Sequence, residues 1–116
     1  MDNCIFCKIL HDEIPAQKIY EDSEVIAFND INPAAPVHFL IIPKIHVASL
    51  MECGKTHQQI LGKMLLLAPT IAKEQGCTDG FRTIINTGRV GGQEVFHLHI
   101  HIIGSKNRLP AMIHKD

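Results

Sequence analysis

The segment VFHLHIHII at positions 95–103 alternates imidazole and apolar side chains without interruption. Successive side chains of a β-strand point to opposite faces, so His97, His99 and His101 are expected to share one face of a strand over 95–103. The apolar set is expected in the core on the other face: Phe96, Leu98, Ile100 and Ile102. The pattern therefore predicts a strand that presents three imidazoles in a row on one surface.

The rest of the chain predicts further strands and one long helix. We expect a helical turn at 4–10, strands at 17–21, 24–29, 37–42 and 81–86, and a helix at 56–75. In the long helix, Thr56 is a candidate N-cap, Gly76 a candidate stop and Pro69 the source of a kink. The first turn is expected to end at 14–15, because the residue before a proline disfavours helix. Together these elements predict an α+β fold with a mostly antiparallel sheet.

Composition limits the classes of protein to which the chain can belong. The 116 residues are 46% hydrophobic and 20% charged, without repeat or linker, which predicts a single domain over 1–116. The 11 basic and 12 acidic side chains give a formal net charge of -1. This balance argues against a nucleic acid as partner, because phosphate backbones demand a basic surplus. No apolar run reaches the roughly 20 residues of a membrane span, and the first ten residues lack a signal-peptide core, so we expect no membrane partner and a cytoplasmic location.

Three histidines in register have two functional interpretations. A His-x-His strand can chelate a metal that keeps an open position for hydrolysis, whereas a single imidazole can act as nucleophile or acid–base group. The loop NTGRVGGQ at 86–93 contains three glycines, whose backbone N–H groups can approach an anion closely. Because this loop leads directly into the histidines, it favours phosphate chemistry at His99.

Longer segments resemble a known family. GQEVFHLHIHII at 92–103 matches the His-φ-His-φ-His-φ-φ signature (φ, apolar) of the histidine triad (HIT) family. FNDINP at 28–33, PVHFLIIPK at 36–44 and IFCKI at 5–9 are similar to that family in order and spacing, so the resemblance covers nearly the whole chain. The tail at 109–116 resembles the bacterial Hint branch, the purine nucleoside phosphoramidases.

The resemblance implies a five-stranded antiparallel sheet with one long helix and a short N-terminal helix, in a homodimer whose sheets join across a two-fold axis. It implies a site for a purine nucleoside monophosphate such as AMP. It also implies that His99 attacks phosphorus, forms a nucleotidyl-histidine intermediate and so hydrolyses P–N bonds of phosphoramidates. His101 and His38 would orient the phosphate and share the charge that develops on it.

The resemblance implies further contacts to the nucleotide. Asp30 would accept from the ribose hydroxyls. The base would lie against Ile5, Phe6, Ile9, Phe28 and Ile31. The phosphate would meet Asn86, Gly92, Glu94 and Val95. At Glu94 many eukaryotic Hint proteins carry serine, and a carboxylate there would repel phosphate unless it turned away, which leaves the preference for the leaving group open.

The pair Cys4 and Cys7 has spacing typical of a metal site. In a chain without a visible export signal, such a pair is more often metal-binding or redox-active than disulfide-bonded. Two thiolates are half of a Zn²⁺ site, and the resemblance to Cys-Cys-His-His members of the family implies His46 and His97 as the other ligands. Such a zinc would be structural, and the chemistry would need no cofactor. Alternatively, both thiols are free and act as small apolar side chains near the base.

Three other functions are also compatible with the sequence, and experiments have to distinguish them. One is a dinucleoside polyphosphate hydrolase of the Fhit type, and another is a nucleotide-binding regulatory protein with little turnover. A third, a hydrolase that uses the histidine row to hold a catalytic metal, would lose its activity with chelator.

Overall fold

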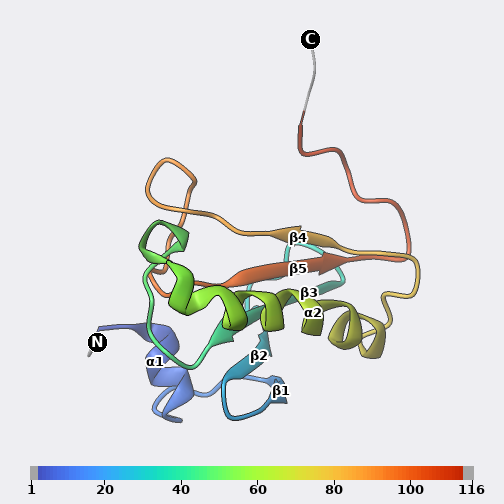
Figure 1. The fold of residues 1–116 in the computed structure, drawn as a ribbon. Helices are drawn as coiled ribbons and strands as arrows, with labels where there is room; N and C mark the ends of the chain where they lie inside the picture. Colours follow the sequence, from blue (N-terminus) through green and yellow to red (C-terminus); the bar gives the residue numbers. More distant parts are fainter. Residues whose placement is uncertain (1–2, 114–116) are drawn as a thin grey trace.

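Five antiparallel strands form one sheet in the order β1-β2-β3-β5-β4 (Figure 1). The structure is a computed structural model that describes residues 3–113. The strands are β1 (Lys18–Glu21), β2 (Val25–Asn29), β3 (Val37–Pro43), β4 (Arg82–Ile84) and β5 (Ile100–Gly104). The helices are α1 (Ile5–Leu10) and α2 (Gln58–Glu74), with 3₁₀ turns η1 (Leu50–Glu52) and η2 (Lys55–His57). The expected α+β architecture with its five-stranded antiparallel sheet is confirmed.

The two faces of the sheet carry separate cores. Alternation along β3 directs Phe39 and Ile41 to the face on which α2 packs, and α2 runs along this face (Figure 1). Leu40 and Ile42 point to the opposite face, where they pack with side chains of α1. His101 on β5 is the register partner of Leu40, so its imidazole shares the α1 face. The fold therefore places α1 over the side of the sheet that carries the imidazoles.

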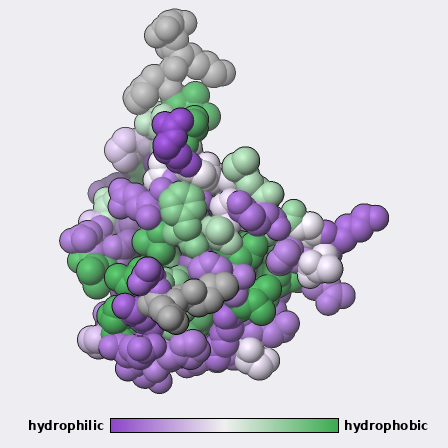
Figure 2. Space-filling model, turned by 90° about the vertical axis from the view of Figure 1, so that its left-hand side faces the viewer, coloured by the Kyte–Doolittle hydropathy of each residue, from purple (hydrophilic) through white to green (hydrophobic). Residues whose placement is uncertain are grey.

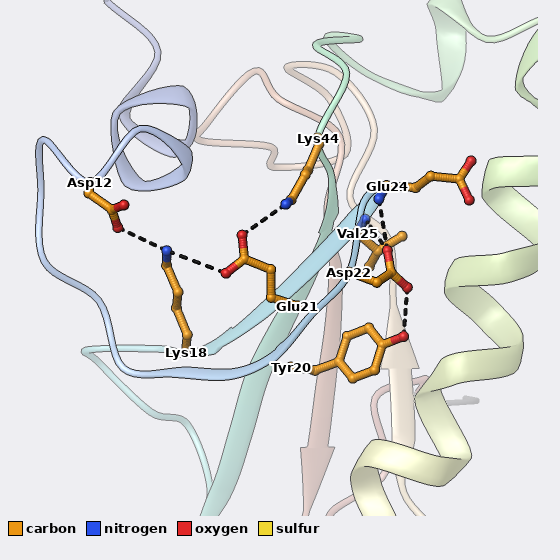
Figure 3. A network of polar contacts seen from close by, with 8 residues as sticks. All are labelled: Asp12, Lys18, Tyr20, Glu21, Asp22, Glu24, Val25 and Lys44. Atoms are coloured by element: carbon orange, nitrogen blue, oxygen red, sulfur yellow. Dashed lines mark hydrogen bonds and ion pairs between the residues drawn. The ribbon is translucent and has the colours of Figure 1, made fainter.

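Polar contacts tie the chain between α1 and the first hairpin (Figure 3). The Asp22 carboxylate accepts backbone hydrogen bonds from Glu24 at 2.8 Å and from Val25 at 2.9 Å, which closes the expected turn between β1 and β2. Lys18 Nζ lies 2.9 Å from Asp12 Oδ1 and so connects β1 to the loop that follows α1. Such exposed ion pairs contribute little stability, but this one restrains the loop that follows α1.

The segment before β5 differs from the predicted strand. Pairing of β5 with β3 begins only at Ile100, and residues 95–99 are irregular. The backbone N–H of Leu98 instead donates to the carbonyl of Val47 at 2.7 Å. The predicted strand is therefore wrong in its first half, and Phe96, expected in the core, is 48% exposed. The alternation of imidazole and apolar residues indicates which side of the segment is buried, but it does not indicate where pairing with β3 stops.

The helix boundaries also differ from those expected. The end of α1 at Leu10 agrees with the turn expected at 4–10, but the residue that stops the helix is Asp12, with a φ of 59° outside the right-handed helical region, and not the Ile14-Pro15 pair. α2 begins at Gln58, since Thr56 lies inside the preceding 3₁₀ turn and does not act as its cap. The expected stop at Gly76 is confirmed by a φ of 98°, which glycine adopts at little cost. Neither helix is long and apolar enough to cross a bilayer, as far as residues 3–113 are concerned.

Candidate functional site

A pocket of about 370 Å³ opens on the α1 face of the sheet. It brings together the residues for which a nucleotide contact is expected: Ile5, Phe6, Ile9, Phe28, Asp30, Ile31, Asn86, Gly92, Glu94 and Val95. His99 and His101 also line it. Segments far apart in the sequence, from α1 to the loop before β5, thus meet in one cavity. The wall also includes residues that were not foreseen: Ile14, Pro15, Ala16, Asn29 and Leu40.

One end of the pocket is apolar and aromatic. Phe6 of α1 is buried and meets Phe28 of β2 edge to face, with ring centroids 5.5 Å apart. The centroid of the same Phe6 ring lies 5.0 Å from that of the His99 imidazole, so α1 contacts both the apolar end of the pocket and the imidazoles. Leu40 completes the floor, and its position on β3, two residues from His38, is the signal that could have indicated it. Such an apolar slot suits a planar base.

Asp30 lies where β2 ends and faces both solvent and histidine. Its Oδ1 accepts a hydrogen bond from the backbone N–H of Asn32 at 2.8 Å, which is the geometry of an Asx turn. Its Oδ2 lies 3.4 Å from Nε2 of His38. The carboxylate therefore has a structural role in the loop and still lines the pocket beside the imidazoles.

His99 is held in one tautomer by the backbone. Its Nδ1 lies 2.7 Å from the carbonyl oxygen of His97. A carbonyl oxygen only accepts, so Nδ1 carries the proton and Nε2 keeps its lone pair. Burial lowers the pKa of His99, which keeps the ring neutral near pH 7. A neutral imidazole with a free Nε2 at a pocket wall is a ready nucleophile.

His101 is oriented by a chain of hydrogen bonds that begins at the backbone. The N–H of Ala34 donates to Nδ1 of His38 at 2.9 Å, so the proton of His38 lies on Nε2. That Nε2–H donates to Nδ1 of His101 at 3.0 Å, which leaves the proton of His101 on its Nε2. Burial, with His99 and His38 nearby, lowers the pKa of His101 to about 4. His101 thus presents a neutral N–H donor at the pocket, whereas His38 lies behind it, outside the pocket lining, and contacts two lining residues, His101 and Asp30.

The third histidine of the row belongs to a different cluster. His97 is fully buried, and its Nε2–H donates to the carbonyl of Pro43 at 2.9 Å, so its lone pair lies on Nδ1. This Nδ1 is 3.3 Å from Cys4 Sγ and 3.5 Å from Cys7 Sγ. Nδ1 of His46 lies 3.4 Å from the sulfur of Cys7. The four expected ligand atoms all lie within 4.8 Å of one another.

The donor set of this cluster fits a tetrahedral zinc ion. Bonds of about 2.3 Å to sulfur and about 2.0 Å to nitrogen at the tetrahedral angle place those atoms roughly 3.5 Å apart, which the observed separations match. Burial lowers the pKa of His97 to about 4 and so keeps it neutral, as a ligand must be. Burial, with Cys4 beside it, raises the pKa of Cys7 to about 11, and a divalent cation is what stabilises thiolates in such surroundings. The carbonyl of Pro43 fixes the ring of His97 as an outer partner commonly does for a ligating histidine.

Comparison with known proteins gives full-length matches. The family described as scavenger mRNA decapping enzyme C-term binding matches residues 3–115. Protein HitA of Neisseria gonorrhoeae is 65% identical over 105 residues, which cover 90% of this chain and 98% of that protein. The purine nucleoside phosphoramidase of Escherichia coli K12 is 44% identical over 115 residues, with coverages of 98% and 97%. A 14 kDa zinc-binding protein of Zea mays is 46% identical over 104 residues, with coverages of 88% and 81%.

Solved structures agree with this picture. A HIT family hydrolase from Clostridium thermocellum superimposes with a TM-score of 0.92 at 46% identity, over 97% of this chain and 99% of the other. A histidine triad protein from Clostridium difficile gives a TM-score of 0.90 at 49% identity, over 97% of both chains. At such identity the likeness covers the sequence as well as the fold.

Proposed function

The chain belongs to the histidine triad family of hydrolases, and from this premise we propose that it hydrolyses the P–N bond of purine nucleoside phosphoramidates. The observation that carries the proposal is the hydrogen bond from His99 Nδ1 to the carbonyl of His97, which leaves Nε2 as a nucleophile at the pocket wall. The apolar end of the pocket and Asp30 support a purine and a ribose as the rest of the ligand. The phosphoramidase of E. coli, similar over nearly the full length, supports the choice of bond.

In the first half-reaction, the lone pair of His99 Nε2 forms a bond to phosphorus and the P–N bond breaks. The departing nitrogen takes a proton from water, while the Nε2–H of His101, which lines the pocket, donates a hydrogen bond to the phosphoryl oxygens as they gain charge. The phosphorylated ring of His99 carries a positive charge, and its centroid lies 5.0 Å from that of the neutral His101, which keeps its proton on Nε2. The hydrogen bond from His38 to Nδ1 of His101 further stabilises that state.

In the second half-reaction, water replaces the amine. It forms a bond to phosphorus and loses its proton to solvent water, and the bond between phosphorus and His99 breaks with its electron pair returning to Nε2 of His99. The products are a nucleoside monophosphate and the free amine. His38 acts through His101 in both halves and is a positioning residue.

We assign a structural zinc ion to Cys4, Cys7, His46 and His97. When bound, the metal supplies a rigid cross-link between α1 and the segment that carries His99, and it has no part in the chemistry. The donor set, the neutral ring of His97 and the zinc-binding relative from maize support this assignment. An ion held in this way keeps His97 out of the phosphate site.

We also propose a homodimer whose sheets continue across a two-fold axis. Among residues 3–113, β4 has a sheet neighbour on one side only, which leaves its other edge open for pairing. α2 leaves Leu65 and Leu66 47% and 78% exposed. Sedimentation at micromolar concentration is expected to give twice the mass of 12.9 kDa, and a monomer would overturn this point.

To test the reaction, the protein is mixed with adenosine phosphoramidate, the reaction is quenched without acid, and the mass of the intact protein is measured. Wild type is expected to gain one adenylate transiently, and His99→Ala is expected to gain none. The same spectrum under native conditions shows whether zinc is retained. Release of product only from dinucleoside polyphosphates would favour an enzyme of that class, and neither adduct nor product would leave a nucleotide-binding protein.

A further inference from the structure

We propose that Gln93 is a positioning residue for the phosphate of the substrate: its buried side chain holds the phosphate loop, residues 86–95, at a fixed place relative to His99. The proposal rests on the P–N hydrolysis proposed above and adds a residue that does not itself line the nucleotide pocket. Gln93 is 7% exposed, whereas its neighbours Gly92 and Glu94 are exposed and line that pocket. A buried amide between two pocket residues needs hydrogen-bond partners, and all of its partners are backbone groups of the protein.

Gln93 closes the phosphate loop on itself. The backbone N–H of Gln93 donates to the carbonyl of Gly88 at 3.0 Å, and the N–H of Gly88 donates to Oε1 of the Gln93 side chain at 2.9 Å. One residue therefore satisfies both backbone polar groups of Gly88. Nε2 of the same side chain donates to the carbonyl of Val95 at 3.0 Å. The two ends of the stretch 88–95 are thus joined through a single amide.

The same amide connects the phosphate loop to a segment that also holds the nucleophile. Nε2 of Gln93 donates its second proton to the carbonyl of Ala48 at 2.7 Å. The carbonyl of the preceding residue, Val47, accepts from the N–H of Leu98, next to His99, at 2.7 Å. Two neighbouring carbonyls of one segment therefore hold the phosphate loop and the segment of the nucleophile, and this fixes the separation of the two.

Packing of the phosphate loop does not replace these hydrogen bonds. The loop projects beyond the sheet (orange in Figure 1), and Val90 at its tip is 90% exposed. Figure 2 faces this side of the molecule and shows hydrophilic and hydrophobic residues mixed at its surface. Within residues 3–113, the backbone N–H groups of Glu94 and Val95 donate to no acceptor of the protein, and both residues line the pocket. They are free to donate to a bound phosphate, and Gln93 sets their position.

The experiment compares the affinities for AMP and for adenosine by calorimetry. Gln93→Met has a side chain of similar length and loses all three hydrogen bonds of the amide. It is expected to bind AMP at least roughly tenfold more weakly than wild type, which is what a hydrogen bond to a charged group contributes, and adenosine within twofold of wild type. Its kcat for adenosine 5′-phosphoramidate is expected to fall about 100-fold, as for a displacement of roughly 1 Å at the reacting groups. Gln93→Asn keeps the amide without its reach and is expected to show smaller losses of the same kind.

Ile71→Val is the matched control for lost stability, because Ile71 is buried in the core under α2, outside the pocket. It is expected to bind both ligands as wild type does. Unchanged AMP affinity in Gln93→Met, an equal loss for AMP and adenosine, or the same selective loss in Ile71→Val would overturn the role of Gln93.

The binding measurements need no turnover, so they separate this proposal from the proposed function. If wild type bound AMP but hydrolysed no phosphoramidate, the proposed function would be wrong, and the comparison of AMP with adenosine would still decide the role of Gln93. Circular dichroism shows whether each variant is folded. Should Gln93→Met fail to fold, the milder Gln93→Asn provides the same comparison, and an AMP affinity equal to that of wild type would then overturn the proposal.

Discussion

His97 and His99 stand two residues apart in one segment and meet opposite surroundings. A backbone carbonyl takes the Nε2 proton of His97, so its Nδ1 lone pair faces the sulfurs of Cys4 and Cys7. Another carbonyl takes the Nδ1 proton of His99, so its Nε2 lone pair is left at the pocket. The difference teaches that the tautomer, fixed by one backbone acceptor, decides whether the lone pair of an imidazole faces the two sulfurs or the nucleotide pocket.

The two assignments are coupled, because the acceptor for His99 is the carbonyl of His97 itself. A metal that fixes the side chain of His97 therefore also fixes the backbone atom that sets the tautomer of His99. The coupling runs through α1 as well, since Phe6 lies 6.0 Å from the ring of His97 and 5.0 Å from that of His99. A variant that removes the side chain of His97 and keeps its backbone carbonyl tests this comparison.

The largest effect is expected for His99→Ala. Loss of the nucleophile should lower kcat/KM for adenosine phosphoramidate by at least about 10³-fold, measured by release of AMP. His97→Ala keeps its backbone carbonyl, so we expect the adenylate adduct to form on that variant still. Both variants should bind AMP in calorimetry. If His97→Ala formed no adduct although it was folded and bound AMP, the division of roles between the two histidines would be wrong.

The second-largest effect is expected when the metal is removed. Removal of zinc by Cys7→Ser or by chelator should lower the free energy of unfolding, by about 4 kcal/mol where free zinc is a thousandfold above its dissociation constant. Because α1 forms a wall of the nucleotide pocket, AMP affinity should fall too, roughly tenfold, and AMP should raise zinc affinity by the same factor.

Cys53→Ser is the control for the metal experiment, because Cys53 lies in the chain between β3 and α2, outside the cluster. It should leave zinc content and AMP affinity unchanged. Calorimetry of AMP binding with and without metal measures the coupling. Equal AMP affinities in the two forms would mean that α1 holds its position without the metal.

The segment that carries His97 and His99 shows which features of the fold the sequence predicts and which it does not. Alternation correctly put Leu98, Ile100 and Ile102 in the core, since burial of one side needs only local geometry. It could not show that pairing with β3 stops at Ile100, because that depends on where Val47 approaches from another part of the chain. The row of three imidazoles expected at 97–101 is therefore two clusters, not one surface.

Other features of the site and of α2 also divide into those that the sequence predicts and those that it does not. The expected pocket residues do meet in one cavity, since motifs that match a family bring the family's arrangement with them. The position of His38 behind His101 depends on a hydrogen bond from Ala34, which no spacing indicates. Pro69 is accommodated inside α2 because it is exposed, so the carbonyl that lacks its donor can bind water.

A smaller effect is expected at His38. His38→Ala removes the hydrogen bond that orients His101, and kcat should fall roughly tenfold to a hundredfold while KM changes little. His38→Gln can still donate an N–H to Nδ1 of His101 and should recover part of kcat. A rise of KM in place of a fall of kcat would show that His38 acts in binding and not through His101.

The smallest effect is the dependence of stability on pH. Burial lowers the pKa of His101 to about 4, with His99 and His38 contributing in the same direction and Asp30 opposing. Between pH 6.5 and 4 the unfolded chain therefore binds more protons at this position than the folded one, so the contribution of His101 to stability is complete above pH 6.5 and is lost as the pH falls toward 4.

Urea unfolding of the Cys7→Ser protein at several pH values should show this loss. This variant is used without metal, so that the release of zinc in acid does not contribute to the measurement. His101→Gln in the same background should lose less, by roughly 1–2 kcal/mol between pH 6.5 and 4.5, allowing for the partial exposure of the ring. Identical pH profiles would mean that the imidazole of His101 accepts its proton in the folded state as easily as in water, which a neutral ring fixed by the N–H of His38 should not do.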